Sequence, residues 1–248
     1  METTDDFVLG GRLKLLQPVK GHRAGHDAIL LAAAASFAQH AIDLGAGVGT
    51  AGLALLARGA AERVTLVEID PALAALAKEN AKRNGFEGRT EIVTADALKL
   101  ARKGGADRPA AASADLVLMN PPFNDPSRKN LSPDHARRRA HSAADTDLEL
   151  WIGAAERLLM ANGRLVFIHR PESAGAILAA LKGLFGATEI IPIFPREDAP
   201  AIRLIVRAIK GRRTPPVLLR GIVLNDANNQ PSDAASKILH DAGPLSPA

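Results

Sequence analysis

Apolar runs alternate with helix-like segments through most of the chain. Five short runs have the length and aliphatic content of buried strands, at 41–44, 64–67, 91–93, 116–119 and 164–168. Helices are predicted between or after them, at 50–58, 71–84, 148–160 and 173–183. This order is typical of βαβ units that wind a parallel sheet. The sequence therefore predicts an α/β fold built on a doubly wound, mostly parallel sheet.

Turn residues agree with these boundaries. Pro71 suits the first turn of a helix, and Asn84-Gly85 and Asn162-Gly163 suit helix ends. Two further apolar runs, 189–194 and 201–209, are separated by only six residues. A connection this short predicts a hairpin that gives the parallel sheet an antiparallel edge.

Composition limits the class of protein. With 248 residues, 47% of them apolar, the chain can form one large domain with a buried core. The absence of cysteine excludes disulfides and thiolate metal sites and fits a reducing compartment. The acidic N-terminus lacks the features of an export signal, and no apolar run reaches the length of a membrane span. We therefore expect a cytoplasmic protein without a membrane or metal partner.

A glycine-rich loop follows the first predicted strand and opens a helix, in the stretch Asp43-Leu44-Gly45-Ala46-Gly47-Val48-Gly49-Thr50. Glycines at this place allow a tight turn and a close approach of a ligand to the backbone, as in nucleotide-binding loops. The dinucleotide fingerprint would place its third glycine at position 50, whereas this chain has Gly49 and Thr50. The loop therefore predicts a nucleotide-type ligand but departs from the dinucleotide pattern.

Acidic residues stand at the ends of three consecutive predicted strands: Asp43, Glu68 and Asp96. Open α/β sheets bind ligands at the carboxyl ends of their strands, and a carboxylate such as Glu68 can accept both hydrogen bonds of a ribose diol. In the alternative interpretation, Asp43 and Asp96 cap helices and Glu68 is a solvated strand end.

The fourth strand ends in Asn120-Pro121-Pro122-Phe123. The two prolines stop the strand and fix the backbone, so that Asn120 is presented at its carboxyl end. The Asn120 amide oxygen and the Pro121 carbonyl can each accept one N–H of a planar amine, which favours pyramidal nitrogen and directs its lone pair. Phe123 can stack on the ring that carries the amine. Alone, the tetrapeptide is equally compatible with a proline turn.

Two motifs carry a family resemblance. The GxGxG loop with its preceding acid resembles class I S-adenosyl-L-methionine-dependent methyltransferases, and Asn-Pro-Pro-Phe is similar to the (N/D/S)PP(F/Y) signature of amino-methyltransferases. That group acts on adenine N6, cytosine N4, guanine N2 or a glutamine amide. The resemblance implies a Rossmann-like, seven-stranded sheet and S-adenosylmethionine as cofactor. It implies cofactor contacts for Gly25, Asp27, Asp43, Gly45, Gly47, Gly49, Glu68, Ile69, Asp96, Ala97 and Asn120.

The two ends of the chain narrow the resemblance. The stretch from Gln17 to Ala32 resembles the GTDxILL element of bacterial enzymes that methylate adenine N6 in the anticodon loop of a valine tRNA, with His26 where that family usually has Thr or Ile. Residues 221–226 and 232–239 are similar to the closing strand and helix of those enzymes. The implied organisation is a substrate-side extension (1–40), a methyltransferase domain (41–210) and a tail on the same domain (211–248). The implied partner is tRNA.

Cations follow the Asn-Pro-Pro-Phe motif within 124–144, and the net charge of +4 permits a polyanionic partner. The residues expected to contact RNA phosphates are Lys20, Arg23, Arg128, Lys129, Arg137, Arg138 and Arg139. A solvated charge run is the alternative. With 3% aromatic residues an extended base-stacking surface is not expected, and Trp151 is expected in the core. Protein-glutamine methylation, small-molecule methylation and RNA binding without catalysis remain the competing functions.

Overall fold

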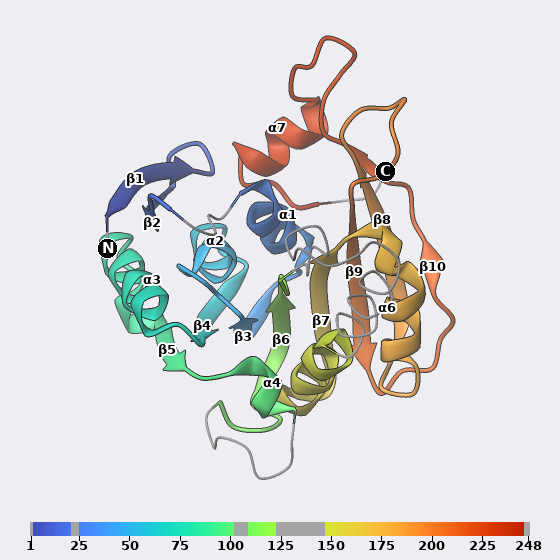
Figure 1. The fold of residues 1–248 in the computed structure, drawn as a ribbon, viewed down its shortest axis with the longest axis horizontal. Coiled ribbons are helices and arrows are strands. Elements are labelled where there is room, and N and C mark those ends of the chain that lie inside the picture. Colours follow the sequence, from blue (N-terminus) through green and yellow to red (C-terminus); the bar gives the residue numbers. More distant parts are fainter. Residues whose placement is uncertain (1, 21–24, 102–108, 123–146, 246–248) are drawn as a thin grey trace, which may run out of the picture.

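The computed structural model describes residues 2–20, 25–101, 109–122 and 147–245, which form a large sheet covered by helices on both faces (Figure 1). Its seven main strands are β3 (Ala38–Leu44), β4 (Ala61–Glu68), β5 (Thr90–Thr94), β6 (Ala114–Met119), β7 (Leu159–His169), β8 (Phe185–Phe194) and β9 (Arg203–Lys210). They lie in the order β8-β9-β7-β6-β3-β4-β5. The predicted mostly parallel α/β sheet is confirmed, and in the described part of the chain two short strands bring its seven main strands to nine.

The sheet is parallel except at one strand. β5, β4, β3, β6 and β7 pair in parallel, and β9 pairs antiparallel with both β7 and β8. The predicted hairpin of β8 and β9 is therefore confirmed. The antiparallel strand β9 does not form the edge of the sheet, because it lies between β8 and β7. The two-residue strands β10 (Val217–Leu218) and β11 (Ile222–Val223) add to β8 in parallel.

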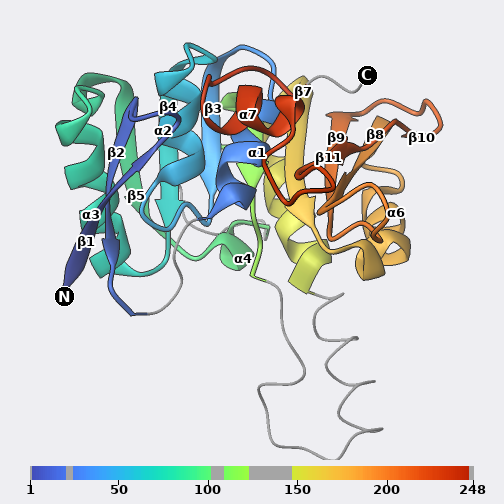
Figure 2. The same cartoon turned by 90° about the horizontal axis from the view of Figure 1, so that it is seen from above.

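Helices cover both faces of the sheet (Figure 2). Two clusters of buried hydrophobic residues hold them there. On one face lie α1 (His26–Ala34), α2 (Thr50–Ala57), α3 (Pro71–Arg83) and α7 (Asp233–Leu239). On the other lie α4 (Ala97–Leu100), the helical residues 147–158 and α6 (Ala174–Leu181). Short 3₁₀ turns occur at η1 (Glu87–Arg89) and η3 (Pro171–Ser173). Because both sheet faces are covered, the central strands are almost wholly apolar. The alternation of apolar strand runs with helices could therefore be predicted from the sequence.

Helix boundaries follow local chemistry with one exception. The Asp70 side chain caps α3 by accepting from Ala72 N at 2.7 Å, Pro71 occupies the first turn, and Asn84 ends the helix as predicted. The expected helix end at Asn162-Gly163 is wrong. Helical structure ends at residue 158, and Asn162, with a φ of +61°, lies inside β7. There Leu159 already pairs with Ala114, and the following residues form a bulge before Arg164 pairs with Leu116.

Both ends of the chain pack on the helix layer that contains α1. At the N-terminal end, β1 (Thr3–Val8) and β2 (Leu13–Pro18) form a separate antiparallel sheet, which the sequence patterns did not predict. At the C-terminal end, Leu245 N donates to Ala33 O at 2.7 Å and Arg58 donates to Gly243 O at 2.7 Å.

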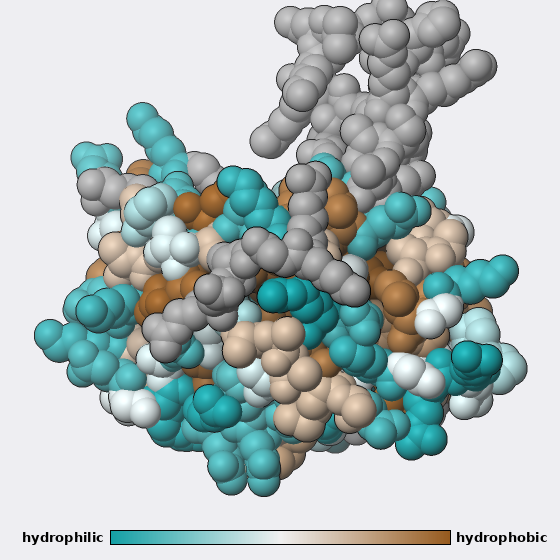
Figure 3. All heavy atoms as spheres, turned by 90° about the horizontal axis from the view of Figure 1, so that it is seen from below, coloured by the Kyte–Doolittle hydropathy of each residue, from teal (hydrophilic) through white to brown (hydrophobic). Residues whose placement is uncertain are grey.

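Hydrophilic side chains project around the rim of the face in Figure 3, between patches of hydrophobic ones. Among the described helices, none is long and apolar enough to cross a membrane.

Candidate functional site

The carboxyl ends of the central parallel strands border a cavity of about 480 Å³. This volume lies within the range of small-molecule and cofactor sites. Its lining comes from the glycine loop, the ends of β4, β5 and β6, and three helices: Gly45, Gly47, Val67, Glu68, Ile69, Leu73, Ala95, Asp96, Ala97, Leu98, Asn120, Pro121, Pro122, Asp147 and Trp151. A smaller cavity of about 60 Å³ shares Gly45, Gly47, Leu73 and Asn120 with it and adds Asp43 and Thr50. Many of the predicted site residues therefore meet at one place.

The glycine loop is bent by three left-handed residues, with φ values of +77°, +57° and +87° at Gly45, Gly47 and Gly49. A side chain is excluded at Gly45 by contact as well, because an added Cβ would lie 2.6 Å from the Trp151 ring. At Gly47, in contrast, an added Cβ would meet nothing within 4 Å. The loop thus turns its Gly47 face toward the open cavity, which leaves room for a ligand beside the backbone.

Glu68 holds the loop from the end of β4. One oxygen of its carboxylate accepts from Gly47 N and the other from Asp70 N, both at 2.8 Å. Glu68 as a whole is only 7% exposed. Glu68 is therefore a buried anchor of the loop, and the alternative of a solvated strand end is wrong.

Asp43 is a buried carboxylic acid at the end of β3. It is 3% exposed, and its Oδ2 accepts from Gly52 N in α2 at 2.8 Å. Burial raises the pKa of Asp43 to about 7; the Gly52 N–H lowers it and the nearby charge of Glu68 raises it further. In the same small cavity, the buried Thr50 Oγ1 has no hydrogen-bond partner among the described residues. Asp43 and Thr50 thus offer polar atoms to a ligand there.

Asp96 caps α4, as the alternative interpretation held for it. Its Oδ1 accepts from Leu98 N at 2.9 Å, and its carboxylate lies 3.8 Å from Lys99 Nζ. The residue also lines the large cavity next to Ala97 and Leu98. Capping and ligand binding are therefore compatible at this position, because a carboxylate has several acceptor sites.

Asn120 lines both cavities at the carboxyl end of β6. Its Oδ1 is buried and has no hydrogen-bond partner among the described residues. An unsatisfied buried amide oxygen is costly, so its presence at a cavity wall points to a ligand donor. Pro121 and Pro122 extend the wall, and Phe123 lies outside the described residues.

Other predicted residues lie elsewhere. Among the described residues that line the two cavities, neither Gly25 nor Asp27 occurs; Gly25 precedes α1, and Asp27 pairs with Arg203 of β9 at 2.8 Å. Lys20 is exposed. The remaining predicted RNA contacts fall outside the described residues: Arg23, Arg128, Lys129, Arg137, Arg138 and Arg139.

Several lining residues were missed by the sequence patterns. Trp151 is buried, as expected, but it also lines the large cavity and packs against the glycine loop. Leu73, Asp147 and Ala28 likewise reach the cavities. Helical periodicity shows which face of a helix is apolar but not which turn of that face meets a ligand, so no local signal could have found them.

Comparison with known proteins identifies the family. The model of the methyltransferase small domain matches residues 24–193. The chain belongs to the methyltransferase small domain family.

Relatives of this methyltransferase carry more specific names. A tRNA1(Val) (adenine(37)-N6)-methyltransferase from Porphyromonas gingivalis is 36% identical over 59% of this chain and 58% of that protein, so the match spans less than two thirds of the relative. A protein of the same name from Actinobacillus pleuropneumoniae is 28% identical over 86% of each chain. A solved structure, a predicted O-methyltransferase from Agrobacterium tumefaciens, has a TM-score of 0.69 and 29% identity, and covers 86% of this chain and 94% of that one.

The methyltransferase uses S-adenosylmethionine, and its cavity fits that cofactor. The open face of Gly47 leaves room for a bulky ligand beside the loop. The buried Thr50 Oγ1, which has no hydrogen-bond partner among the described residues, lines the adjoining small cavity together with Asp43. The cavity of this methyltransferase small domain is therefore suited to S-adenosylmethionine. Among the described residues, no group of three or more His, Asp or Glu side chains is placed to hold a metal ion.

Proposed function

We propose that the protein methylates the exocyclic N6 amine of an adenine in tRNA, in the anticodon loop of a valine tRNA. The observation that carries this proposal is the buried Oδ1 of Asn120, which lacks a partner among the described residues and lies on the wall of the cofactor cavity. A hydrogen-bond-accepting oxygen at this place favours a methyl-accepting group that has N–H bonds to donate.

The cofactor-side assignments extend the proposal. Glu68 holds the ribose hydroxyls, Asp96 and Ala97 bind the adenine edge beside Ile69, and Asp43 faces the methionyl amino group. Glu68 can do so while it anchors the loop, since each carboxylate oxygen has two lone pairs and each already uses one. Ile69 is 60% exposed, which leaves its side chain free to cover one face of a ring.

The residues of the chain orient the acceptor. When bound, S-adenosylmethionine supplies an electrophilic methyl group on a positively charged sulfur. Asn120 Oδ1 accepts one N–H of the amine and the Pro121 carbonyl accepts the other, so that the nitrogen becomes pyramidal and its lone pair faces the methyl group. The rigid prolines hold both acceptors in place before the reaction. After transfer, the nitrogen loses its extra proton to solvent.

The names of relatives support a tRNA acceptor, and the chemistry of the site supports a nitrogen over an oxygen acceptor. Relatives from two bacteria carry the name of a tRNA adenine-N6 methyltransferase. The name of the Agrobacterium structure points instead to an oxygen acceptor. A hydroxyl, however, has one O–H and cannot satisfy both Asn120 Oδ1 and the Pro121 carbonyl. A protein glutamine amide also has two N–H bonds, and the experiment below distinguishes it from tRNA as the methyl acceptor.

The test is methyl transfer from labelled S-adenosylmethionine to tRNA that lacks modifications, followed by nucleoside analysis. We expect N6-methyladenosine with the wild-type protein and a rate at least about 100-fold lower with Asn120→Ala, the magnitude of losing an oxyanion-type contact. Asn228→Ala is the matched control, because Asn228 is exposed on a turn away from the cavities. Cofactor affinity is measured for each variant, so that a loss of turnover is separated from a loss of binding.

Three results would contradict the proposal. Label in protein but not in RNA would favour the glutamine alternative. Label in a ribose ether would favour an oxygen acceptor. An Asn120→Ala variant with wild-type turnover would remove the role assigned to Asn120.

A further inference from the structure

One face of α3 connects the cofactor cavity with the N-terminal hairpin. Leu73, Ala77, Asn80 and Asn84 follow one another at spacings of three or four residues, so they lie along a single stripe of the helix. Leu73 lines both cavities. Ala77 lies beside the glycine loop, since a Cβ added to Gly49 would come within 3.4 Å of the Ala77 Cβ. The stripe then continues from the loop to the hairpin.

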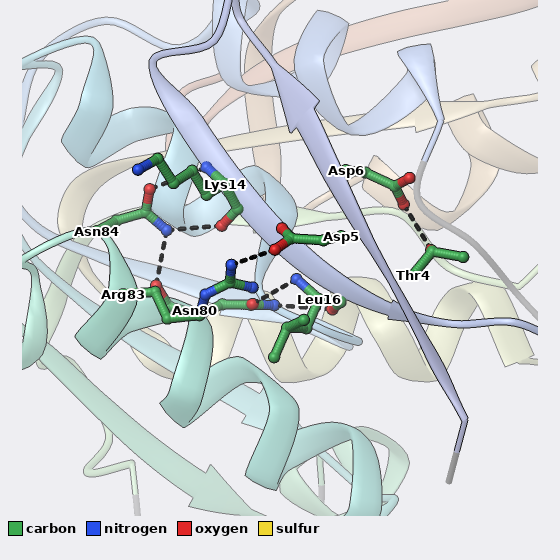
Figure 4. Close-up of polar contacts among 8 residues, drawn as sticks. All are labelled: Thr4, Asp5, Asp6, Lys14, Leu16, Asn80, Arg83 and Asn84. Atoms are coloured by element: carbon green, nitrogen blue, oxygen red, sulfur yellow. Dashed lines mark hydrogen bonds and ion pairs between the residues drawn. The ribbon is translucent and has the colours of Figure 1, made fainter.

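Asn80 joins the two structures. Its Oδ1 accepts from Leu16 N of β2 at 2.7 Å, and its Nδ2 donates to Leu16 O at 3.1 Å (Figure 4). The same Nδ2 donates to Val48 O, between Gly47 and Gly49 of the loop, at 3.1 Å. The residue has no exposed surface. Because water cannot replace these bonds easily, three backbone groups depend on one amide.

We propose that Asn80 is a positioning residue for the cofactor loop, through which the N-terminal hairpin supports the S-adenosylmethionine site. Glu68 fixes the loop at Gly47 N from the strand side, and Asn80 fixes the adjacent Val48 carbonyl from the helix side. Between these two anchors, the open face of Gly47 is held toward the cavity. Loss of the Asn80 anchor releases Val48 and lowers the fraction of molecules whose loop is ready to bind cofactor.

Asn84 provides a matched control on the same helix. Its Oδ1 accepts from Lys14 N at 2.9 Å, and its Nδ2 donates to Lys14 O at 2.7 Å, so it attaches the same strand to α3 as Asn80 does (Figure 4). Its remaining bond goes to Asn80 O, within the helix, and not to the loop. The two asparagines therefore share the attachment of the hairpin and differ in the contact with Val48.

The experiment compares Asn80→Ala with Asn84→Ala in the full chain. Affinity for S-adenosylmethionine is measured by calorimetry, thermal stability by unfolding, and protection of the loop by hydrogen exchange of residues 45–49 without cofactor. We expect the Kd for S-adenosylmethionine to rise at least about fivefold in Asn80→Ala and less than about twofold in Asn84→Ala. Both variants should have a lower Tm. Only in Asn80→Ala should the amide hydrogens of residues 45–49 exchange faster than the loss of global stability accounts for. With acceptor present, the KM for the cofactor should rise while kcat stays near that of the wild type.

A Kd within about twofold of the wild-type value in folded Asn80→Ala would overturn the proposal. Equal weakening by Asn80→Ala and Asn84→Ala would also overturn it, because the effect would then come from the attachment of the hairpin alone. If Asn80→Ala does not fold, Asn80→Ser and Asn84→Ser are compared by the same criteria, since a hydroxyl retains one donor. If no Asn80 variant folds while the Asn84 variants do, Asn80 is a general structural residue and the positioning role is rejected.

Discussion

Replacement of Asp43 by Asn should stabilise the protein at neutral and alkaline pH. Burial raises the pKa of Asp43 from 3.8 to about 7. An asparagine side chain at this position would have nearly the same shape and could still accept from Gly52 N, but it carries no charge to bury. The folded wild-type protein holds a proton at Asp43 that the unfolded chain has released, so its stability falls as the pH rises from the unfolded pKa to the folded one.

The magnitude follows from the difference between the two pKa values. Asp43→Asn should be more stable than the wild type by roughly 1.5 kcal/mol at about pH 5 and roughly 4 kcal/mol at about pH 8. Above the folded pKa the difference should remain constant, because Asp43 is then ionised in both states. Urea unfolding of both proteins at several pH values measures the difference directly, and the effects of titrating groups that do not interact with Asp43 cancel in it.

The pH dependence is the decisive part of this measurement. A stability difference that stays constant between about pH 5 and about pH 8 would show that Asp43 titrates normally in the folded protein and would refute the reasoning from burial. If the stability difference fell with rising pH, the pH dependence would have the opposite sign to the expected one. That result would indicate that the ionised carboxylate is stabilised by its neighbours. The variant should also bind S-adenosylmethionine less well, since the negative charge beside the proposed methionyl site is lost.

Three further predictions concern the ligands. Gly47→Ala should weaken cofactor binding at least about tenfold, measured by calorimetry, because it strains a left-handed residue and places a methyl group in the cavity; unchanged binding would place the cofactor elsewhere. The fluorescence of Trp151, the single tryptophan of the chain, should change when S-adenosylmethionine binds, and a titration without change would separate the cofactor from this wall. Combined replacement of Arg137, Arg138 and Arg139 by Ala should weaken tRNA binding and lower its salt slope by up to about three, whereas an unchanged slope would favour a solvated charge run.

The central sheet could be predicted because its strands are buried on both faces. Runs such as 116–119 are apolar without interruption, and no other element of that length and composition competes with a strand. The N-terminal hairpin gave no such signal. The residues of β1 alternate between exposed and partly buried, and the hairpin is held by side chains of α3 that lie more than sixty positions away. Such long-range pairing has no counterpart in local periodicity.

The candidate site was predictable where the chemistry is carried by backbone constraints. Glycines with positive φ and prolines at a strand end are recognisable in the sequence. The glycine loop and Asn120 both line the cavity at the carboxyl ends of the strands, as these residues predicted. Asp27 was assigned to the cofactor by resemblance alone, and it pairs with Arg203. The dipeptide Asn162-Gly163 suits a helix end in isolation, but strand pairing at Leu159 places it in a bulge. At Asn162-Gly163, tertiary strand pairing therefore overrides the local signal.

The arrangement of the loop explains why the cofactor site can be formed before a ligand arrives. Val67 O accepts from Gly45 N, Glu68 holds Gly47 N, and Asn80 holds Val48 O. These three anchors come from β4 and α3, both packed in the main core, so the loop conformation is fixed by the fold. A preformed loop lowers the entropy lost on binding. Affinity for S-adenosylmethionine should therefore depend on buried anchors such as Asn80 as well as on the residues that touch the ligand.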